Sequence, residues 1–189
     1  MDVLGYDYGI MDYQAKLVAP FGMLGIRCET NALTGIEFLA PDATPQPPDN
    51  TFARTVCEQL MAYFEDAEFH FDLPLKLDGT AHQGKVWQAM SAIPSGQTRH
   101  YGDLALQLNS SPRAVGQACG SNPIPIVIPC HRVVSKAGMG GFMHHSSGYS
   151  LDIKRWLLKH ENNFSIPKDM SFRAQREILD TKDSSLRRE

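Results

Sequence analysis

The chain has 189 residues, of which 42% are hydrophobic and 21% charged, a composition typical of a globular protein with one or two small domains. No apolar run is long enough to cross a membrane, and the first residues carry acid rather than a basic leader, so we expect no secretory signal and a cytoplasmic protein. Four scattered cysteines without a Cys-x-x-Cys pair predict neither a disulfide framework nor a zinc site.

The net charge of −3 hides an asymmetry along the chain. Residues 1–80 carry a net charge of −9, whereas residues 81–189 carry +6. Such an asymmetry indicates a polyanionic partner for the basic part. The alternative is a chance split together with a solvated basic tail.

The first third of the chain reads as a small α/β domain. Residues 13–19, 25–29 and 33–39 favour strands, and Pro20-Phe21-Gly22 forms a turn-like break between the first two. The proline-rich segment 41–50 predicts a loop, and apolar residues at helical spacing predict a helix over 51–67.

Three helices are predicted next. Thr80 and Gln83 form a candidate capping box for a helix that ends near residue 93, and a short helix follows over 101–108. Ser111 is a good N-cap for a further helix that reaches about residue 119. The last two helices resemble a helix-turn-helix, and the small residues Ala114 and Ala118 would let the second one approach a surface closely. The alternative is that these residues pack against another helix of the protein.

The segment that follows carries the strongest chemical signal. An apolar stretch over 124–128, expected to be a buried strand, leads through Pro129 to Cys130 and His131. Thiolate is a strong nucleophile near neutral pH, and a neighbouring histidine makes it available. The alternative is a structural cysteine at the end of a core strand.

A glycine-rich turn over 135–141 precedes a last helix, predicted over 151–160 with Ile153, Trp156 and Leu157 buried. Residues 162–189 are highly charged, with one marginal helix about 172–179. We therefore expect an α+β protein with a small α/β N-terminal domain over 1–72, a mostly helical domain with a helix-turn-helix over 73–164, and a charged tail over 165–189.

Residues 75–161 resemble the C-terminal domain of the O6-alkylguanine-DNA alkyltransferases, the methylated-DNA–protein-cysteine methyltransferase family, and residues 13–70 resemble its N-terminal domain more loosely. The matching blocks lie in the same order as in the family: Gly79-Thr80, Val86-Trp87, Ile93-Pro94, Tyr101, Arg113-Ala114-Val115-Gly116, Asn122-Pro123, the run 125–134 around Cys130, Lys154, Leu157-Leu158 and Glu161.

The resemblance implies a DNA repair reaction. The family transfers a methyl or small alkyl group irreversibly from O6 of guanine, with O4 of thymine as a further candidate, to its own cysteine, here Cys130. An in-line displacement at carbon by sulfur needs no metal and no cofactor, and each molecule acts once. The implied partner is double-stranded DNA that contains O6-alkylguanine. The resemblance also implies that the protein acts as a monomer and that no membrane is involved.

The resemblance also assigns roles around the cysteine. His131 corresponds to the base that deprotonates Cys130 through a water, and Glu161 to the carboxylate that orients this histidine. Tyr101 corresponds to a donor to the guanine ring, and Asn122 to the residue that braces the active-site turn.

The DNA-binding residues follow from the same resemblance. Arg113 corresponds to the arginine that fills the space left when the nucleotide rotates out of the duplex. Ala114 and Ala118 permit the second helix to lie in the minor groove. Arg99 and Tyr101 are the other implied DNA-binding residues. Arg132 is expected to form a structural ion pair rather than a DNA contact.

Two departures from the family pattern affect the pocket. The span from Tyr101 to Arg113 is slightly short, so Arg113 is either displaced or held by a tighter turn. The loop 141–150 is longer than the family's and rearranged, and it normally offers a hydroxyl to O6. The pocket residues implied are Pro125, Val133 and Val134, with Ser146, Ser147 or Ser150 as the hydroxyl.

Two other classes of function stay open. A non-catalytic lesion sensor resembles this domain but lacks the cysteine, so Cys130 argues against that class. A cysteine hydrolase could use Cys130, His131 and Glu161, and it would turn over an ester or amide without DNA.

Overall fold

A three-stranded antiparallel sheet forms the first part of the molecule. The structure is a computed structural model and describes residues 13–40, 42–145 and 148–161. The strands β1 (Ala15–Ala19), β2 (Gly22–Glu29) and β3 (Ala32–Leu39) lie in the order β1-β2-β3. The second strand begins earlier than predicted, because Ala19 pairs directly with Gly22 and the break is a tight hairpin turn.

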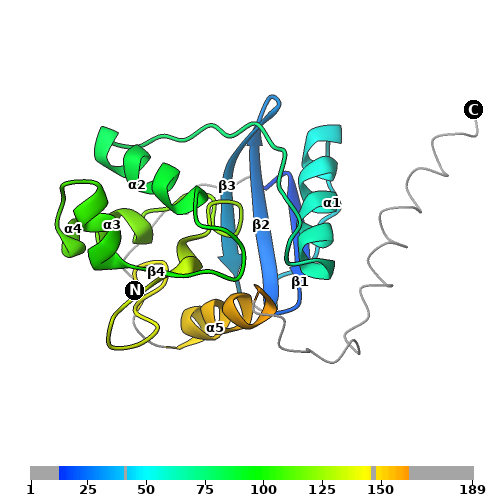
Figure 1. Cartoon of the computed structure of the whole chain (residues 1–189). Helices are drawn as coiled ribbons and strands as arrows, with labels where there is room; N and C mark the ends of the chain where they lie inside the picture. Colours follow the sequence, from blue (N-terminus) through cyan, green and yellow to red (C-terminus); the bar gives the residue numbers. More distant parts are fainter. Residues whose placement is uncertain (1–12, 41, 146–147, 162–189) are drawn as a thin grey trace, which may run out of the picture.

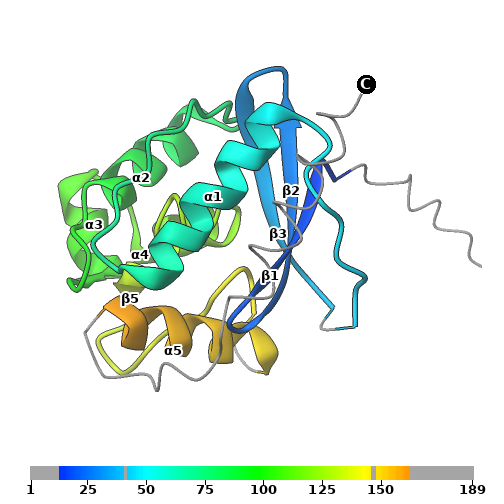
Figure 2. The same cartoon turned by 90° about the vertical axis from the view of Figure 1, so that its right-hand side faces the viewer.

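Helix α1 (Thr51–Glu65) covers one side of this sheet (Figures 1 and 2). The Asn50 side chain caps its first turn by accepting a hydrogen bond from the Ala53 N–H at 2.8 Å. The helix ends two residues before the predicted limit, since Asp66 takes an extended conformation. Its buried face fits the apolar periodicity: Ala53, Val56, Cys57, Leu60, Met61, Tyr63 and Phe64.

Helices α2 (Ala81–Ser91), α3 (Tyr101–Gln107) and α4 (Pro112–Gly120) group together away from α1 (Figure 1). The predicted capping box of α2 is confirmed, with Thr80 and Gln83 each bonding the other's backbone. Ser111 caps α4 as predicted. The turn between α3 and α4 is tightened, because Asn109 has a φ of 50° and the Ser110 N–H bonds Ala105.

Helix α5 (Tyr149–Glu161) and a short parallel ladder complete the fold. The ladder joins β4 (Arg99–His100) to β5 (Val133–Val134), and the 3₁₀ helix η1 (Cys130–Arg132) precedes β5. Ile153 and Leu157 are buried as predicted, whereas Trp156 is only half-buried, with its ring stacked on His160. The α+β class is therefore confirmed.

The strand predicted over 124–128 is wrong, because this segment is a tight turn. The Ile128 N–H bonds the Ile124 carbonyl at 2.9 Å, and Ile126 has a φ of 76°. Pro125 has no N–H to offer a ladder, and the Asn122 side chain takes the polar groups that a neighbouring strand would pair with. A β-branched residue at positive φ costs on the order of 1–3 kcal/mol, which the surrounding contacts must offset.

Backbone hydrogen bonds tie the sheet to the remaining part of the molecule. The Ile36 N–H of β3 donates to Pro123 at 2.9 Å, and Leu33 pairs with Leu75. No helix among the described residues has the length and apolar character required to cross a membrane. The tail over 165–189, with its predicted helix, lies outside the described residues, and the domain limits remain predictions.

Trp87 offers a test of how α2 holds α4. Its indole Nε1 donates to the Ala118 carbonyl at 2.9 Å, and the ring is 2% exposed. Trp87→Phe removes this donor and leaves a cavity, so the free energy of unfolding in urea should fall by about 1–3 kcal/mol. Gln88→Ala, at an exposed neighbour in the same helix, should change it little. Equal stabilities of the two variants would contradict this bracing role.

Candidate functional site

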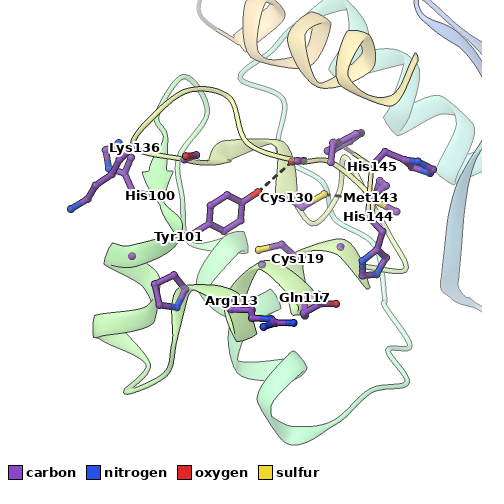
Figure 3. A pocket seen from close by; sticks show the side chains of 17 residues that line it. His100, Tyr101, Arg113, Gln117, Cys119, Cys130, Lys136, Met143, His144 and His145 are labelled. Carbon is purple, nitrogen blue, oxygen red and sulfur yellow. Dashed lines mark hydrogen bonds between the residues drawn. The ribbon is translucent and has the colours of Figure 1, made fainter. Parts of the chain in front are cut away.

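A cavity of about 770 Å³ opens between α3, α4, η1 and the segment 141–145 (Figure 3). Cys130 lines this cavity, as do Tyr101 and Arg113. The structure thus brings together three of the site residues predicted from widely separated parts of the sequence. A thiol and a phenol face the same space, which is large enough for a nucleobase-sized ligand.

Cys130 is a buried residue that lines the cavity. Its residue exposure is 3%, and its Sγ lies 4.0 Å from the Met143 Sδ. Burial raises the pKa of the Cys130 thiol to about 11, against the opposing effects of the Asn122 side chain and the Lys154 charge. The resting group is therefore a thiol, and any nucleophilic reaction requires a base to remove its proton.

His131 is suited to be that base. It is fully buried, and its Nε2 lies 2.7 Å from the Glu161 Oε1. Burial lowers the pKa of His131, although Glu161 opposes this effect, so the ring is neutral near pH 7. With the proton on Nε2, as this contact requires, Nδ1 is an acceptor, and it has no partner among the described residues.

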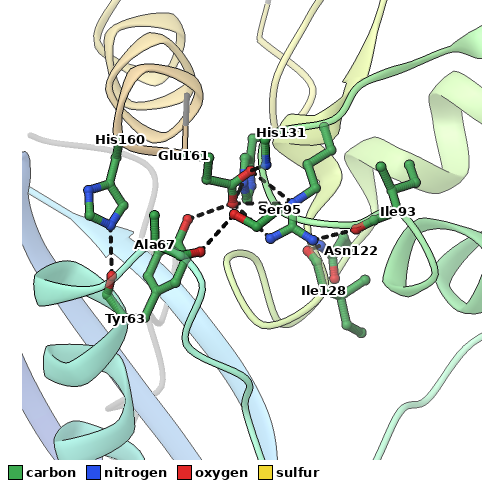
Figure 4. Close-up of polar contacts among 11 residues, drawn as sticks. Tyr63, Ala67, Ile93, Ser95, Asn122, Ile128, His131, His160 and Glu161 are labelled. Carbon is green, nitrogen blue, oxygen red and sulfur yellow. Dashed lines mark hydrogen bonds and ion pairs between the residues drawn. The ribbon is translucent and has the colours of Figure 1, made fainter. Parts of the chain in front are cut away.

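Glu161 is a buried carboxylate held by several donors (Figure 4). Arg132 donates from Nε to Oε2 at 2.9 Å and from Nη2 to Oε1 at 2.8 Å, which confirms the predicted ion pair. Burial alone would raise the pKa of Glu161, but His131 and Arg132 together hold it well below its usual range. The group therefore stays ionised and fixes the orientation of the histidine.

The Asn122 side chain joins both ends of the turn that precedes Cys130. Its Nδ2 donates to the Ile128 carbonyl at 2.7 Å, and its Oδ1 accepts from the Ile124 N–H at 3.0 Å. These bonds satisfy a polar side chain that is 1% exposed. They also fix the direction in which the backbone enters η1.

Tyr101 and Lys154 meet at one carbonyl. The Tyr101 hydroxyl donates to Gly141 at 3.3 Å, and the Lys154 Nζ donates to Gly141 at 2.9 Å and to Val133 at 2.7 Å. Burial raises the pKa of Tyr101 to about 12 and lowers that of Lys154 to about 8. The Tyr101 hydroxyl therefore stays protonated and remains a donor. Lys154 places an ammonium group near the cysteine, and this group loses its charge as the pH rises through its pKa of about 8.

Comparison with known proteins places these features in a family. Residues 81–163 match the family described as "6-O-methylguanine DNA methyltransferase, DNA binding domain". The methylated-DNA–protein-cysteine methyltransferase of Mycobacterium tuberculosis is 37% identical over 168 residues, which cover 85% of this chain and 98% of that protein. The chain belongs to the methylated-DNA–protein-cysteine methyltransferase family.

Further members agree with this assignment. The Methanosarcina acetivorans relative of the same name is 36% identical, over 80% of this chain and 99% of its own length. The crystal structure of the M. tuberculosis O6-methylguanine methyltransferase has a TM-score of 0.68 at 34% identity and covers 82% of this chain and 96% of that one. M. tuberculosis OGT in complex with DNA has a TM-score of 0.64 at 37% identity, over 78% and 91% of the two chains.

One face of α4 lines the cavity, and it differs from the face expected. Ala118 is 2% exposed and packs toward the core, so the prediction that it faces a partner is wrong; Ala114 is half-buried and does not line the cavity. Six residues of α4 line it, and four of them recur at helical spacing: Arg113, Gly116, Gln117 and Gly120, beside Pro112 and Cys119. Counting from Arg113 at that spacing would have found the other three.

Most of the expected pocket residues lie away from the cavity. Pro125 belongs to the tight turn, and Val133 and Val134 pair with β4, so none of the three lines it. Ser150 lies in the first turn of α5 and does not line it either. Arg99 is exposed in β4, outside the lining, and Ser146 and Ser147 lie outside the described residues.

A two-residue turn forms the cavity wall instead. Phe142 and His145 exchange backbone hydrogen bonds of 2.8 Å, while Met143 and His144 have φ values of 49° and 63°. Phe142 anchors the turn in the core beside Phe38. Two consecutive non-glycine residues at positive φ are strained, so side-chain contacts must hold them.

The imidazole of His144 fastens this turn to α4. Its Nε2 lies 3.2 Å from the Ser121 Oγ. A Cβ at Gly120 would come within 2.6 Å of the same ring, so only glycine admits the contact. The wall and the end of the helix are therefore in direct contact.

No metal site accompanies the cavity in the described part of the chain. No group of three or more His, Cys, Asp or Glu side chains is arranged there to hold a metal ion. The polar groups of this region are an imidazole that can accept a proton and three donors, an amide, a phenol and an ammonium, which suit proton transfer and charge stabilisation.

Lys154→Met tests the influence of the buried ammonium on the thiol. Losing the positive charge should raise the pKa of Cys130 further and slow its alkylation by iodoacetamide. Because the pKa of Lys154 is about 8, the difference from wild type should be largest below that pH and shrink above it. Lys159→Met, at an exposed position of the same helix, is the control. Identical alkylation rates near pH 7 would show that Lys154 has no electrostatic effect on the sulfur.

Proposed function

We propose that this protein repairs DNA by transferring a methyl or small alkyl group from O6 of guanine irreversibly to Cys130. The observation that carries the proposal is a cavity-lining thiol, Cys130, followed in the chain by a buried neutral histidine whose Nε2 is held by Glu161 and whose Nδ1, unpartnered among the described residues, is free to accept a proton. The names of the relatives and the DNA complex of the M. tuberculosis protein support DNA as the partner.

The chemistry follows from these groups. The Nδ1 of His131 accepts the thiol proton through a water, and the thiolate attacks the alkyl carbon in line with the bond to O6. A carbon–sulfur bond forms while the carbon–oxygen bond breaks, and its electron pair remains on the guanine. The Tyr101 hydroxyl, which donates to the Gly141 carbonyl in this structure, turns from that carbonyl to donate a hydrogen bond to the ring as negative charge grows there. No cofactor is consumed, and the thioether product limits each molecule to one transfer.

A guanine stacked in a duplex cannot reach a sulfur that is 3% exposed. The nucleotide must therefore rotate out of the helix, at a cost of about a few kcal/mol. Arg113 is exposed and lines the cavity, which supports its proposed role of filling the vacated space. At Gly116 an added Cβ would meet no other atom, so α4 has a small, open position there that permits close approach and supports its placement in the minor groove.

The proposal includes several finer expectations from the sequence. The substrate is O6-alkylguanine in double-stranded DNA, with O4-alkylthymine as a further candidate, and a monomer carries out the reaction. The limits of the N-terminal, helical and tail regions are 1–72, 73–164 and 165–189. Lys136 joins Arg113 in the lining and adds a second cationic side chain there, which suits binding of the DNA phosphates.

Mass spectrometry of the peptide that contains Cys130 tests the transfer. After incubation with duplex DNA that contains O6-methylguanine, the peptide should gain the mass of one methyl group, and the lesion should disappear in equal amount. Cys130→Ala should abolish transfer but retain binding to the lesion, whereas Cys119→Ala, at the second cavity thiol, should retain transfer. An unmodified peptide beside an intact lesion would refute the proposal. DNA-independent turnover of an ester would favour a cysteine hydrolase.

Arg113→Ala tests the rotation of the nucleotide. This variant should transfer the methyl group from duplex DNA at least roughly tenfold more slowly, because the vacated space stays unfilled. Its reaction with the free base O6-methylguanine should change little. Arg155→Ala, at an exposed arginine outside the cavity, is the control on both substrates. Equal losses on duplex and free base would contradict this role of Arg113.

A further inference from the structure

Tyr63, on the helix that packs against the N-terminal sheet, reaches the carboxylate behind the candidate base. Its hydroxyl donates to the Glu161 Oε1 at 2.8 Å, and the residue is 1% exposed (Figure 4). The same oxygen lies 2.7 Å from the His131 Nε2. The sheet-and-helix part of the molecule thus contacts the proton-transfer chain directly.

We propose that Tyr63 is a positioning residue for alkyl transfer: its hydroxyl fixes the carboxylate that orients His131. This inference rests on the function proposed above and deepens it. It gives the N-terminal part of the chain a role in the chemistry, although the described residues that line the cavity all come from position 100 onward.

The arrangement of donors explains why this one hydroxyl matters. Arg132 and His131 both belong to η1, so the bonds they make to Glu161 move together with the nucleophile segment. Among the described residues, the donors to the carboxylate from outside η1 are the Tyr63 hydroxyl and the Gly96 N–H, the latter at 3.5 Å. Tyr63 therefore supplies the short bond that fixes Glu161 relative to an independent element.

Tyr63 is itself held firmly in place. Its carbonyl accepts from the His160 Nε2 at 2.7 Å, and its ring packs against Phe71 at a centroid distance of 5.4 Å. Burial and the Glu161 charge both raise the pKa of Tyr63, so the hydroxyl remains protonated and can only donate to the carboxylate. The ends of α1 and α5 are thus joined by two hydrogen bonds of Tyr63, one from its hydroxyl to Glu161 and one from His160 to its carbonyl.

Loss of the hydroxyl would have two effects on His131. The Glu161 Oε1 would keep more of its negative charge for the imidazole, which raises the pKa of His131. The carboxylate would also lose a fixed partner, so the imidazole would be less well oriented. A merely structural contact between the two helices would produce neither effect.

The test is Tyr63→Phe in the full chain, with the single-turnover rate of methyl transfer measured in the DNA-bound complex across about pH 5 to 9. The rate should fall roughly tenfold, as for other partners that orient a functional histidine. DNA affinity should be unchanged, and the NMR titration of the His131 ring should shift to higher pH.

Ser95→Ala is the matched control. The Ser95 hydroxyl donates to the Ala67 carbonyl at 2.7 Å, and it joins the same two parts of the molecule without a bond to Glu161. This variant should keep both the wild-type rate and the wild-type titration of His131. Tyr63→Phe with a wild-type rate and pH profile, or with only the loss seen for Ser95→Ala, would overturn the inference.

A pair of amino-acid analogues at position 63 decides the question even if the phenylalanine variant folds poorly. 4-Aminophenylalanine keeps a donor at the same place and should restore transfer, whereas 4-fluorophenylalanine, which fills the space without a donor, should not. Equal rates for the two analogues would refute the role of the hydroxyl. A wild-type protein that transfers no methyl group would instead refute the proposed function itself.

Discussion

The buried carboxylate of Glu161 is the interaction on which the candidate site depends. It lies at the end of α5, yet its partners come from η1 and α1, so three distant parts of the sequence meet at one charge. A buried charge is tolerated only when its hydrogen bonds are satisfied, and here Arg132 neutralises it while His131 and Tyr63 complete its shell. The histidine beside the thiol consequently has a single orientation.

The second constraint is the turn that delivers the cysteine. Asn122 replaces strand pairing with two side-chain hydrogen bonds, and this lets the chain reverse sharply before η1. The strain at Ile126 is the cost of that reversal. Because the Ile36 N–H of the sheet bonds Pro123, the turn is anchored to the sheet as well as to the helical part.

Local rules were sufficient for much of the fold and failed where tertiary contacts decide. The capping box of α2 and the N-cap of α4 were readable because each depends on residues three apart in the sequence. The segment 124–128 was predicted as a strand because its apolar composition fits a strand as well as a buried turn. The hydrogen bonds from Asn122 that decide between the two cannot be inferred from hydrophobic periodicity. The inward direction of Ala118 depends on how α4 packs against Trp87. The wall at Met143 and His144 has positive φ values, which methionine and histidine do not predict from the sequence.

The contact between His144 and Gly120 also limits which substitutions this pocket can accept among homologous proteins. A methyl group at position 120 would overlap the imidazole, so a larger residue at 120 requires a change at 144 as well. Homologous proteins that share this wall should therefore show correlated substitution at the two positions. Those with a larger residue at 120 must build the wall of the cavity from a differently shaped loop.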